Sequence, residues 1–168
     1  MTHSDEAAVQ SAVVVERVYR APVEDLWALW TTKDGFESWW GPEGFRVEVR
    51  RLEPRQGGAL EYDMIADAPE AIAAMKAIGQ PVSHGTRGTY AEFRPHARLS
   101  LVHVIDFIQG AAPYEHTIEV DFAPAGADQA RMTVTIHAHH DAHWTRMAVQ
   151  GFTSQLAKLD RRYGWMQA

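Results

Sequence analysis

The chain has 168 residues, of which 46% are hydrophobic and 23% are charged, so it is long enough for one globular domain and short for two. Its apolar runs are brief, as at 12–15, which excludes a membrane-spanning helix and a signal-peptide core. The lack of cysteine excludes disulfides, thiolate metal sites and cysteine nucleophiles, and it fits a reducing compartment. We therefore expect a cytoplasmic protein that does not bind membranes.

The net charge argues against nucleic acid as a partner. Aspartate and glutamate outnumber lysine and arginine by 22 to 16, which gives a formal charge of −6. Binding of a phosphate backbone depends on a surplus of basic side chains. We therefore expect no nucleic-acid partner.

The chain begins with a polar segment that leads into a strand. Residues 1–11 lack hydrophobic periodicity, so we expect a flexible tail there and a single domain at 12–168. The β-branched run within 12–20 predicts the first strand of this domain.

Two short helices are expected after the first strand. Apolar residues recur at i, i+3, i+4 and i+7 from Val23, which is typical of an amphipathic helix. Trp27 and Trp30 lie on its apolar face, so we expect them in the core. A second helix is expected at 34–40, because the Gly-Pro pair at 41–42 does not continue a helix.

From Phe45 onward the hydrophobic period changes from helical to alternating. Alternation of an apolar and a polar face is typical of strands in an antiparallel sheet. The pair at 57–58 predicts a turn between the first two of these strands, and a weaker strand is expected at 89–92. The inward sets of the other strands are Leu60, Tyr62 and Met64; Leu99, Leu101, His103 and Ile105; His116, Ile118, Val120 and Phe122; and Met132, Val134, Ile136 and Ala138.

The C-terminal segment predicts one long helix. Asp141 is a suitable N-cap, and an apolar stripe continues from there to Tyr163. This helix is the long apolar cover for the inward face of the sheet. We expect an α+β fold in which a curved antiparallel sheet of about six to seven strands wraps around the C-terminal helix, with two short helices after the first strand.

A helical insertion is expected at 67–83. Pro69 suits a first helical turn, and Gly79 and Pro81 end the helix. Met75 and several alanines form a small, adaptable apolar surface. Two interpretations stay open: a lid over a cavity mouth or a dimer contact, and a surface helix without a role, since long insertions cost little.

Four segments together are similar to one protein family. They are RVYRAPVEDLW (17–27), WWGPEGF (39–45), PRQGG (54–58) and QGFTSQLAKL (150–159). The Trp-Trp-Gly-Pro element with the Gly-Gly turn after it is the more specific part. Over residues 12–163 the chain resembles the SRPBCC (START-like, birch-pollen-allergen-like) superfamily, in the branch of homologues of the activator of heat-shock protein 90 ATPase.

The resemblance implies a helix-grip fold with a ligand cavity between the sheet and the long helix. It implies no single reaction, because the superfamily shares a shape and differs in use. Relatives often have tryptophan at the positions of His103 and Phe152, which implies a reshaped pocket in this chain. The chaperone activator resembles this domain only in its C-terminal half, so we do not expect co-chaperone activity.

Two histidines are the most informative polar residues of the expected sheet. Alternation places His103 and His116 on the apolar face. Antiparallel register then sets His103 opposite either His116 or Ile118. Each imidazole needs a hydrogen-bond partner. Two kinds of partner stay open: a polar ligand or ordered water, and a core tyrosine such as Tyr62 or Tyr90.

The expected cavity lining combines inward strand residues, a tryptophan pair and one face of the long helix. Trp39 and Trp40 are adjacent, so we expect that they do not both point inward and that one of them faces the cavity mouth. Gly151 permits either close packing of the helix or space for a ligand. The candidate ligand-binding residues are Trp39, Trp40, Tyr62, Met64, Tyr90, Leu101, His103, His116, Ile118, Met147, Gly151, Phe152 and Gln155.

The histidine-rich segment at 137–143 raises the question of a metal site. His137 and His139 share a strand face, and His143 on the first helical turn offers a third nitrogen ligand. However, alternation places His137 and His139 on the solvent face, with Asp141 as the one evident carboxylate. We therefore expect no metal site, and we expect no cofactor.

The favoured function is binding of a small hydrophobic or aromatic molecule by a monomer or homodimer. A second hypothesis is a polyketide cyclase or aromatase-like enzyme in which His103 or His116 acts as general acid or base. A third is an interaction module like the chaperone ATPase activator. The sequence has no nucleophile elbow, phosphate-binding loop or cofactor fingerprint, so we assign no catalytic residue.

Overall fold

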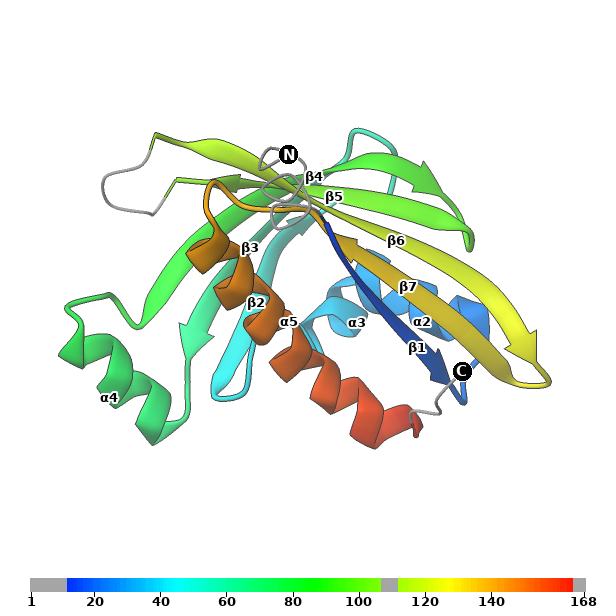
Figure 1. Cartoon of the computed structure of the whole chain (residues 1–168), viewed down its shortest axis with the longest axis horizontal. Helices are drawn as coiled ribbons and strands as arrows, with labels where there is room; N and C mark the ends of the chain where they lie inside the picture. Colours follow the sequence, from blue (N-terminus) through cyan, green and yellow to red (C-terminus); the bar gives the residue numbers. More distant parts are fainter. Residues whose placement is uncertain (1–11, 107–111, 165–168) are drawn as a thin grey trace, which may run out of the picture.

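The computed structural model describes residues 12–106 and 112–164, so the expected tail at 1–11 lies outside the described part. The described residues form seven strands and four helices (Figure 1). In chain order these are β1 (Val13–Tyr19), α2 (Val23–Thr31), α3 (Lys33–Glu37), β2 (Phe45–Leu52), β3 (Ala59–Ala66), α4 (Pro69–Ala77), β4 (Ser83–Arg94), β5 (Arg98–Ile105), β6 (Tyr114–Gly126), β7 (Gln129–Ile136) and α5 (Ala142–Tyr163).

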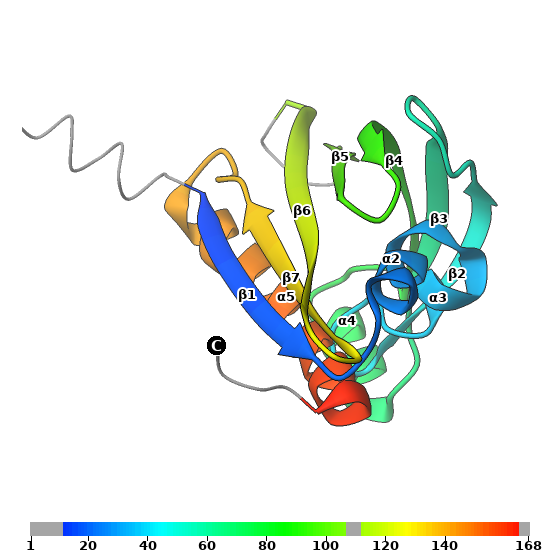
Figure 2. The same cartoon turned by 90° about the vertical axis from the view of Figure 1, so that its right-hand side faces the viewer.

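All seven strands belong to one antiparallel sheet in the order β1-β7-β6-β5-β4-β3-β2. Figure 2 shows the sheet curving from β1 on one side to β2 on the other. The long helix α5 crosses the concave side, and α2 and α3 close one end (Figure 1). The expected helix-grip α+β fold is confirmed. None of the described helices is long and apolar enough to cross a membrane.

The register between β5 and β6 decides between the two partners expected for His103. His103 is paired with His116, and Leu101 is paired with Ile118. Both histidines are 5% exposed, as alternation predicts for the concave face. The sheet therefore places two imidazoles side by side under the helix.

Strand β4 is longer than the sequence pattern indicated. A strand was expected only at 89–92, whereas β4 begins at Ser83 and pairs with β3 from Ile65 to Ala59. Residues 83–88 are polar and contain two glycines, so they lack the apolar alternation that reveals a strand. Their backbone hydrogen bonds to β3 hold them in the sheet.

An aromatic core fills the end of the sheet that α2 and α3 close. Trp27 and Trp30 are 7% and 0% exposed, which confirms that both belong to the core. The Trp30 ring lies 5.1 Å from Trp39 and 5.4 Å from Trp40 between centroids, edge to face in both cases. Such pairs add about 0.5–1.5 kcal/mol each beyond area burial.

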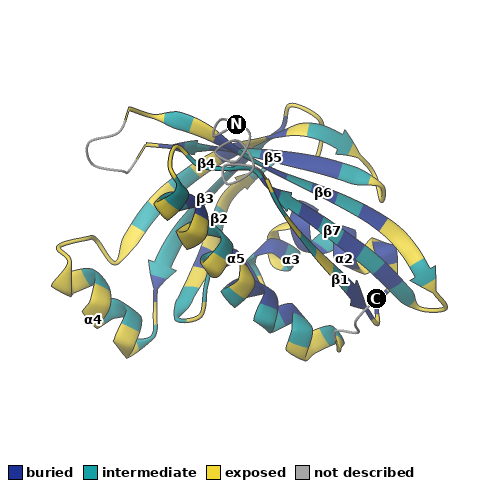
Figure 3. Ribbon diagram, in the orientation of Figure 1, coloured by how far each residue is buried: buried dark blue, intermediate teal, exposed yellow. Residues whose placement is uncertain are grey.

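The insertion forms helix α4, which projects from the β3–β4 connection and has no buried residue (Figure 3). Its base is fixed to the loop before β2: the Gly44 carbonyl accepts hydrogen bonds from the backbone N–H groups of Asp67 and Ala68. A side chain at position 44 would meet Ala71, since an added Cβ would lie 3.1 Å from the Ala71 Cβ. The glycine permits this close approach.

Two aspartates fix the long helix α5, one at its start and one near its end, where it is tied to β1. Asp141 caps α5 at its start, as expected, by accepting a bond from the Trp144 backbone N–H. Toward its end, the Asp160 carboxylate accepts a 2.6 Å hydrogen bond from the Tyr19 hydroxyl and a 3.1 Å bond from Arg17 Nε. Burial raises the pKa of Tyr19, so its hydroxyl keeps the proton that it donates.

We expect Asp160→Ala to lower the free energy of unfolding by about 1–3 kcal/mol, because it removes the acceptor of a buried hydroxyl. Glu43→Ala is the matched control, since the pair of Glu43 with Arg161 is more than half exposed and such pairs contribute about 0–1 kcal/mol. Urea unfolding followed by tryptophan fluorescence measures both. Equal effects of the two variants would contradict the anchoring role of Asp160.

Candidate functional site

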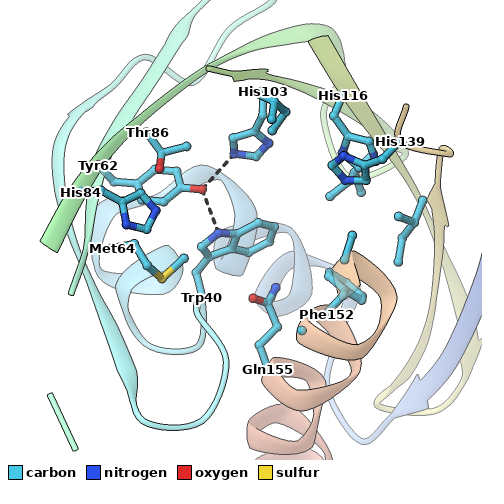
Figure 4. Close-up of a pocket in the computed structure, with 15 residues that line it drawn as sticks. Trp40, Tyr62, Met64, His84, Thr86, His103, His116, His139, Phe152 and Gln155 are labelled. Atoms are coloured by element: carbon cyan, nitrogen blue, oxygen red, sulfur yellow. Dashed lines mark hydrogen bonds between the residues drawn. The ribbon is translucent and has the colours of Figure 1, made fainter. Parts of the chain in front are cut away.

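A cavity of about 210 Å³ lies between the concave face of the sheet and α5 (Figure 4). Its walls come from β3 to β7, from α5, and from the segment after α3 and the segment after β7. The residues that line it are Trp40, Tyr62, Met64, His84, Thr86, His103, Ile105, His116, Ile118, Ile136, His139, Ala148, Gly151, Phe152 and Gln155.

Nine of the thirteen candidate ligand-binding residues line this cavity. They share the concave face of the sheet, the loop after α3, or one face of α5: Trp40, Tyr62, Met64, His103, His116, Ile118, Gly151, Phe152 and Gln155. The spacing of the last three along α5 is that of one helical stripe.

Four candidates lie elsewhere. Tyr90 and Leu101 are fully buried but belong to the aromatic core, where the Tyr90 hydroxyl donates to the Trp30 carbonyl at 2.6 Å. Met147 is 50% exposed, because it lies off the stripe of α5 that faces the sheet. Trp39 is fully buried, and its indole N–H donates to the Leu29 carbonyl at 2.9 Å.

The expectation that only one of the adjacent tryptophans turns inward is wrong. Trp39 is 0% exposed and Trp40 is 6% exposed. The helix expected at 34–40 ends at Glu37, and the pair follows it in a turn, whose irregular backbone directs both side chains inward. Trp39 enters the core beneath α2, and Trp40 forms a cavity wall.

Sequence reasoning missed six lining residues. Ile105 and Ile136 had been placed on the inward face but not in the site. His84 and Thr86 follow from Tyr90 by alternation once β4 is known to extend to Ser83. The other two are Ala148 and His139.

Trp40, Tyr62 and His103 form one hydrogen-bonded unit on the cavity wall (Figure 4). The Trp40 indole N–H donates to the Tyr62 hydroxyl oxygen at 3.0 Å, and that oxygen lies 3.0 Å from His103 Nε2. Burial, together with nearby His116, lowers the pKa of His103 to about 4. His103 is therefore a neutral imidazole at neutral pH, with a core tyrosine as its partner.

A second polar unit contains two stacked imidazoles. The rings of His116 and His139 lie 3.8 Å apart between centroids with 14° between their planes. The Nε2 of His116 donates to the His137 carbonyl at 2.7 Å, because a carbonyl only accepts. The Tyr114 hydroxyl bonds to Nδ1 of His139. Burial, followed by the proximity of His116, lowers the pKa of His139 to about 4.

The expectation that His139 lies on the solvent face is wrong. Strand β7 ends at Ile136, so alternation does not extend to 139, and the chain turns His139 toward the cavity. The Nε2 atom of His137 instead lies 3.3 Å from Oε2 of Glu119, and the side chain of His143 is exposed. Among residues 12–106 and 112–164 no group of three or more His, Asp or Glu side chains is arranged to hold a metal ion.

The loop that carries Trp40 is fixed to α5 through its backbone. The Gly41 N–H donates to Gln155 Oε1 at 2.9 Å, and the Gly41 carbonyl accepts from Lys158 Nζ at 2.8 Å. Next to it, the Glu43 N–H donates to the Ser154 hydroxyl at 3.0 Å. These bonds hold the indole wall of the cavity against the helix.

Gly151 leaves space in the cavity rather than permitting close packing. An added Cβ at this position would have no heavy atom within 4 Å. Glycine inside a helix costs about 0.8–1.0 kcal/mol relative to alanine, and no close approach of the sheet compensates for it. Of the two interpretations drawn from the sequence, this favours the one in which Gly151 provides room.

The described cavity lining contains no Asp, Glu, Lys or Arg. Its polar groups are imidazoles, two hydroxyls, one amide and the indole N–H of Trp40. Burial also lowers the pKa of His84 and of His116. At neutral pH the cavity is therefore an uncharged, largely apolar space with aromatic walls.

We expect stability to fall as the pH drops from about 6.5 to about 4, because in that range unfolded histidines bind protons that the folded His103 and His139 exclude. The slope is about 1.4 kcal/mol per pH unit for each fully excluded proton. His103→Gln retains an amide partner for Tyr62 and removes a titrating ring, so its slope should be smaller. Urea unfolding at pH values across this window measures the slopes, and identical slopes would contradict the interpretation.

A model of the family described as Activator of Hsp90 ATPase homolog 1-like protein matches residues 20–164. Similar solved structures include protein CV1439 from Chromobacterium violaceum, with a TM-score of 0.70, 23% identity, and coverage of 89% of this chain and 94% of that chain. The AHSA1 (SPO3351) protein from Silicibacter pomeroyi has a TM-score of 0.69 and 19% identity, with coverage of 90% and 96%. Protein NE0264 from Nitrosomonas europaea has a TM-score of 0.67 and 16% identity, with coverage of 90% and 93%.

A comparison with curated proteins finds no significant match. At these identities the solved structures establish the fold alone. The family model covers most of the chain, and its match agrees with the resemblance seen at 17–27, 39–45, 54–58 and 150–159. The chain therefore belongs to the family of Activator of Hsp90 ATPase homolog 1-like proteins, a branch of the SRPBCC superfamily.

Proposed function

We propose that the protein binds a small, mainly apolar aromatic molecule in the cavity between the sheet and α5. The observation that carries this proposal is a pocket of about 210 Å³ that opens to solvent and reaches between the sheet and α5, with mainly apolar walls. Well-packed cores contain few voids larger than a water molecule, and an engineered apolar cavity of about 150 Å³ binds benzene. The space is therefore suited to a compound of one or two rings.

The chemistry of the walls supports an aromatic occupant. Trp40 and Phe152 present ring surfaces to the cavity, with their centroids 6.2 Å apart. Ile118 and Ile136 add aliphatic surface from the sheet. Aromatic rings pack favourably against such surfaces through dispersion and edge-to-face contacts. Membership of a family with a cavity at this place supports the proposal as well.

A second candidate function is catalysis by the cavity imidazoles. Neutral imidazoles are capable of accepting a proton, and His103 and His116 both line the cavity. Turnover distinguishes catalysis from binding. If the protein converts a compound, and a His116→Ala variant still binds that compound but no longer converts it, His116 takes part in catalysis. Loss of affinity alone would assign recognition.

We expect Gly151→Leu to weaken binding of naphthalene by more than about tenfold. An added Cβ at position 151 has no heavy atom within 4 Å, so the leucine side chain would occupy cavity space that the ligand needs. Thr153→Leu, on an exposed position of the same helix, is the matched control and should change the affinity less than about twofold. Both affinities are measured by tryptophan fluorescence and by backbone amide chemical shifts.

Two results would contradict the proposal. One is naphthalene binding that Gly151→Leu leaves unchanged. The other is a set of amide shifts that map to residues outside the cavity lining. A urea titration of each variant confirms that a lost affinity does not reflect a lost fold.

A further inference from the structure

The side chain of Gln155 carries a buried hydrogen-bond donor without a partner. Gln155 is 4% exposed and lines the cavity. Its Oε1 accepts the Gly41 N–H, whereas its Nε2 has less than 1 Å² of accessible area and no hydrogen-bond partner. Such a group costs about 1–3 kcal/mol of stability.

The orientation of this amide is determined by its neighbour. A backbone N–H only donates, so the Gln155 atom that faces Gly41 must be the carbonyl oxygen. The NH₂ group consequently points the other way. Figure 4 shows the amide end of the side chain directed up into the cavity, between Trp40 and Phe152.

Other polar side chains of the lining have partners of their own, and none of them is a partner of this donor. Tyr62 bonds to Trp40 and lies at 3.0 Å from His103, and Nε2 of His116 donates to a backbone carbonyl. Among the described residues, Gln155 is the one cavity-lining residue with a buried, unpartnered side-chain polar atom.

The charge of the lining restricts what complements this donor. A carboxylate ligand would enter a space without a lysine or arginine, and an amine would enter a space without an aspartate or glutamate. Transfer of an unpaired charge into such a space is strongly unfavourable. A neutral acceptor, such as a carbonyl oxygen, accepts the amide hydrogen without that penalty.

We propose that the occupant of the cavity is an uncharged compound of one or two rings with a carbonyl oxygen, and that the Gln155 amide donates a hydrogen bond to this oxygen. The ring system packs against the wall that Trp40 and Phe152 form, and the oxygen faces the Gln155 amide beside these rings. This inference rests on the proposed binding function and adds the recognition chemistry to it.

Three probes of similar skeleton test the inference: tetralin has no acceptor, 1-tetralone adds a carbonyl, and tetralin-1-carboxylate adds a charge. We expect the parent protein to bind 1-tetralone about tenfold more tightly than tetralin. The carboxylate should bind more weakly than tetralin at neutral pH. Tight binding of the carboxylate would overturn the uncharged character of the occupant.

Gln155→Met retains the length of the side chain and removes the donor. We expect it to bind tetralin with the parent's affinity and to lose the preference for 1-tetralone. Retained affinity for tetralin also shows that the cavity survives the loss of the bond to Gly41. Gln150→Met, at an exposed position of α5, is the matched control and should keep the preference of the parent.

A measurement on the unaltered protein tests the inference even if the Gln155→Met variant does not fold. The side-chain NH₂ resonances of Gln155 should shift on addition of 1-tetralone by more than they do with tetralin. Equal affinities and equal NH₂ shifts for the two probes, both binding in the cavity, would overturn the role of Gln155 and leave the proposed function intact. If neither probe shifts the cavity residues, the proposed function and this inference both fail.

Discussion

A straight helix contacts a strongly curved sheet along one line, and this constraint governs the interior of the protein. At the end closed by α2 and α3, aromatic rings occupy the space beside that line, with Trp30 and Trp39 completely buried there. At the other end neither α2 nor α3 lies over the concave face, and the walls are the strands, α5 and the segments that carry Trp40 and His139. One end of the sheet thus supplies the close packing on which stability depends, and the other leaves a space of about 210 Å³. Trp40 belongs to both, because it packs on Trp30 and also lines the cavity.

Burial makes the cavity histidines neutral without making the cavity inert. The same desolvation that lowers the pKa of His103 and His139 to about 4 leaves rings that hydrogen-bond and stack but do not attract counter-ions. Protonation of one ring of the stacked His116–His139 pair would disfavour protonation of the other, since their centroids are 3.8 Å apart. The two rings are therefore unlike a pair of independent imidazoles, because they do not both become charged at their stacked distance. The proposed selectivity for uncharged compounds and the expected sensitivity to acid both follow from the unfavourable transfer of charge into this space.

Period-two alternation predicted most of the sheet and limited the partner of His103 to His116 or Ile118, because one side of each strand is buried and the other solvated. It failed where that contrast is absent, as in the polar and glycine-containing residues 83–88 at the start of β4. It also failed at His139, because a strand's end depends on its partner's hydrogen bonds rather than on its own side chains. The site was harder to predict than the sheet. Alternation gives the face of a residue but not what covers it, so Tyr90 was assigned to the cavity although α2 covers it.

Two neighbouring positions of α5 lower the stability of the fold, and both face the cavity. Gly151 costs about 1 kcal/mol as a glycine inside a helix, and the Gln155 donor costs about 1–3 kcal/mol as an unpartnered buried group. Alanine at 151 would meet no atom within 4 Å, so packing against the sheet does not require the glycine. The two residues are four apart and therefore lie on the same face of the helix. Local costs of folding that coincide on one wall indicate that this wall is adapted to something other than stability. A bound molecule that fills the space beside Gly151 and accepts the hydrogen of Gln155 would offset both costs at once.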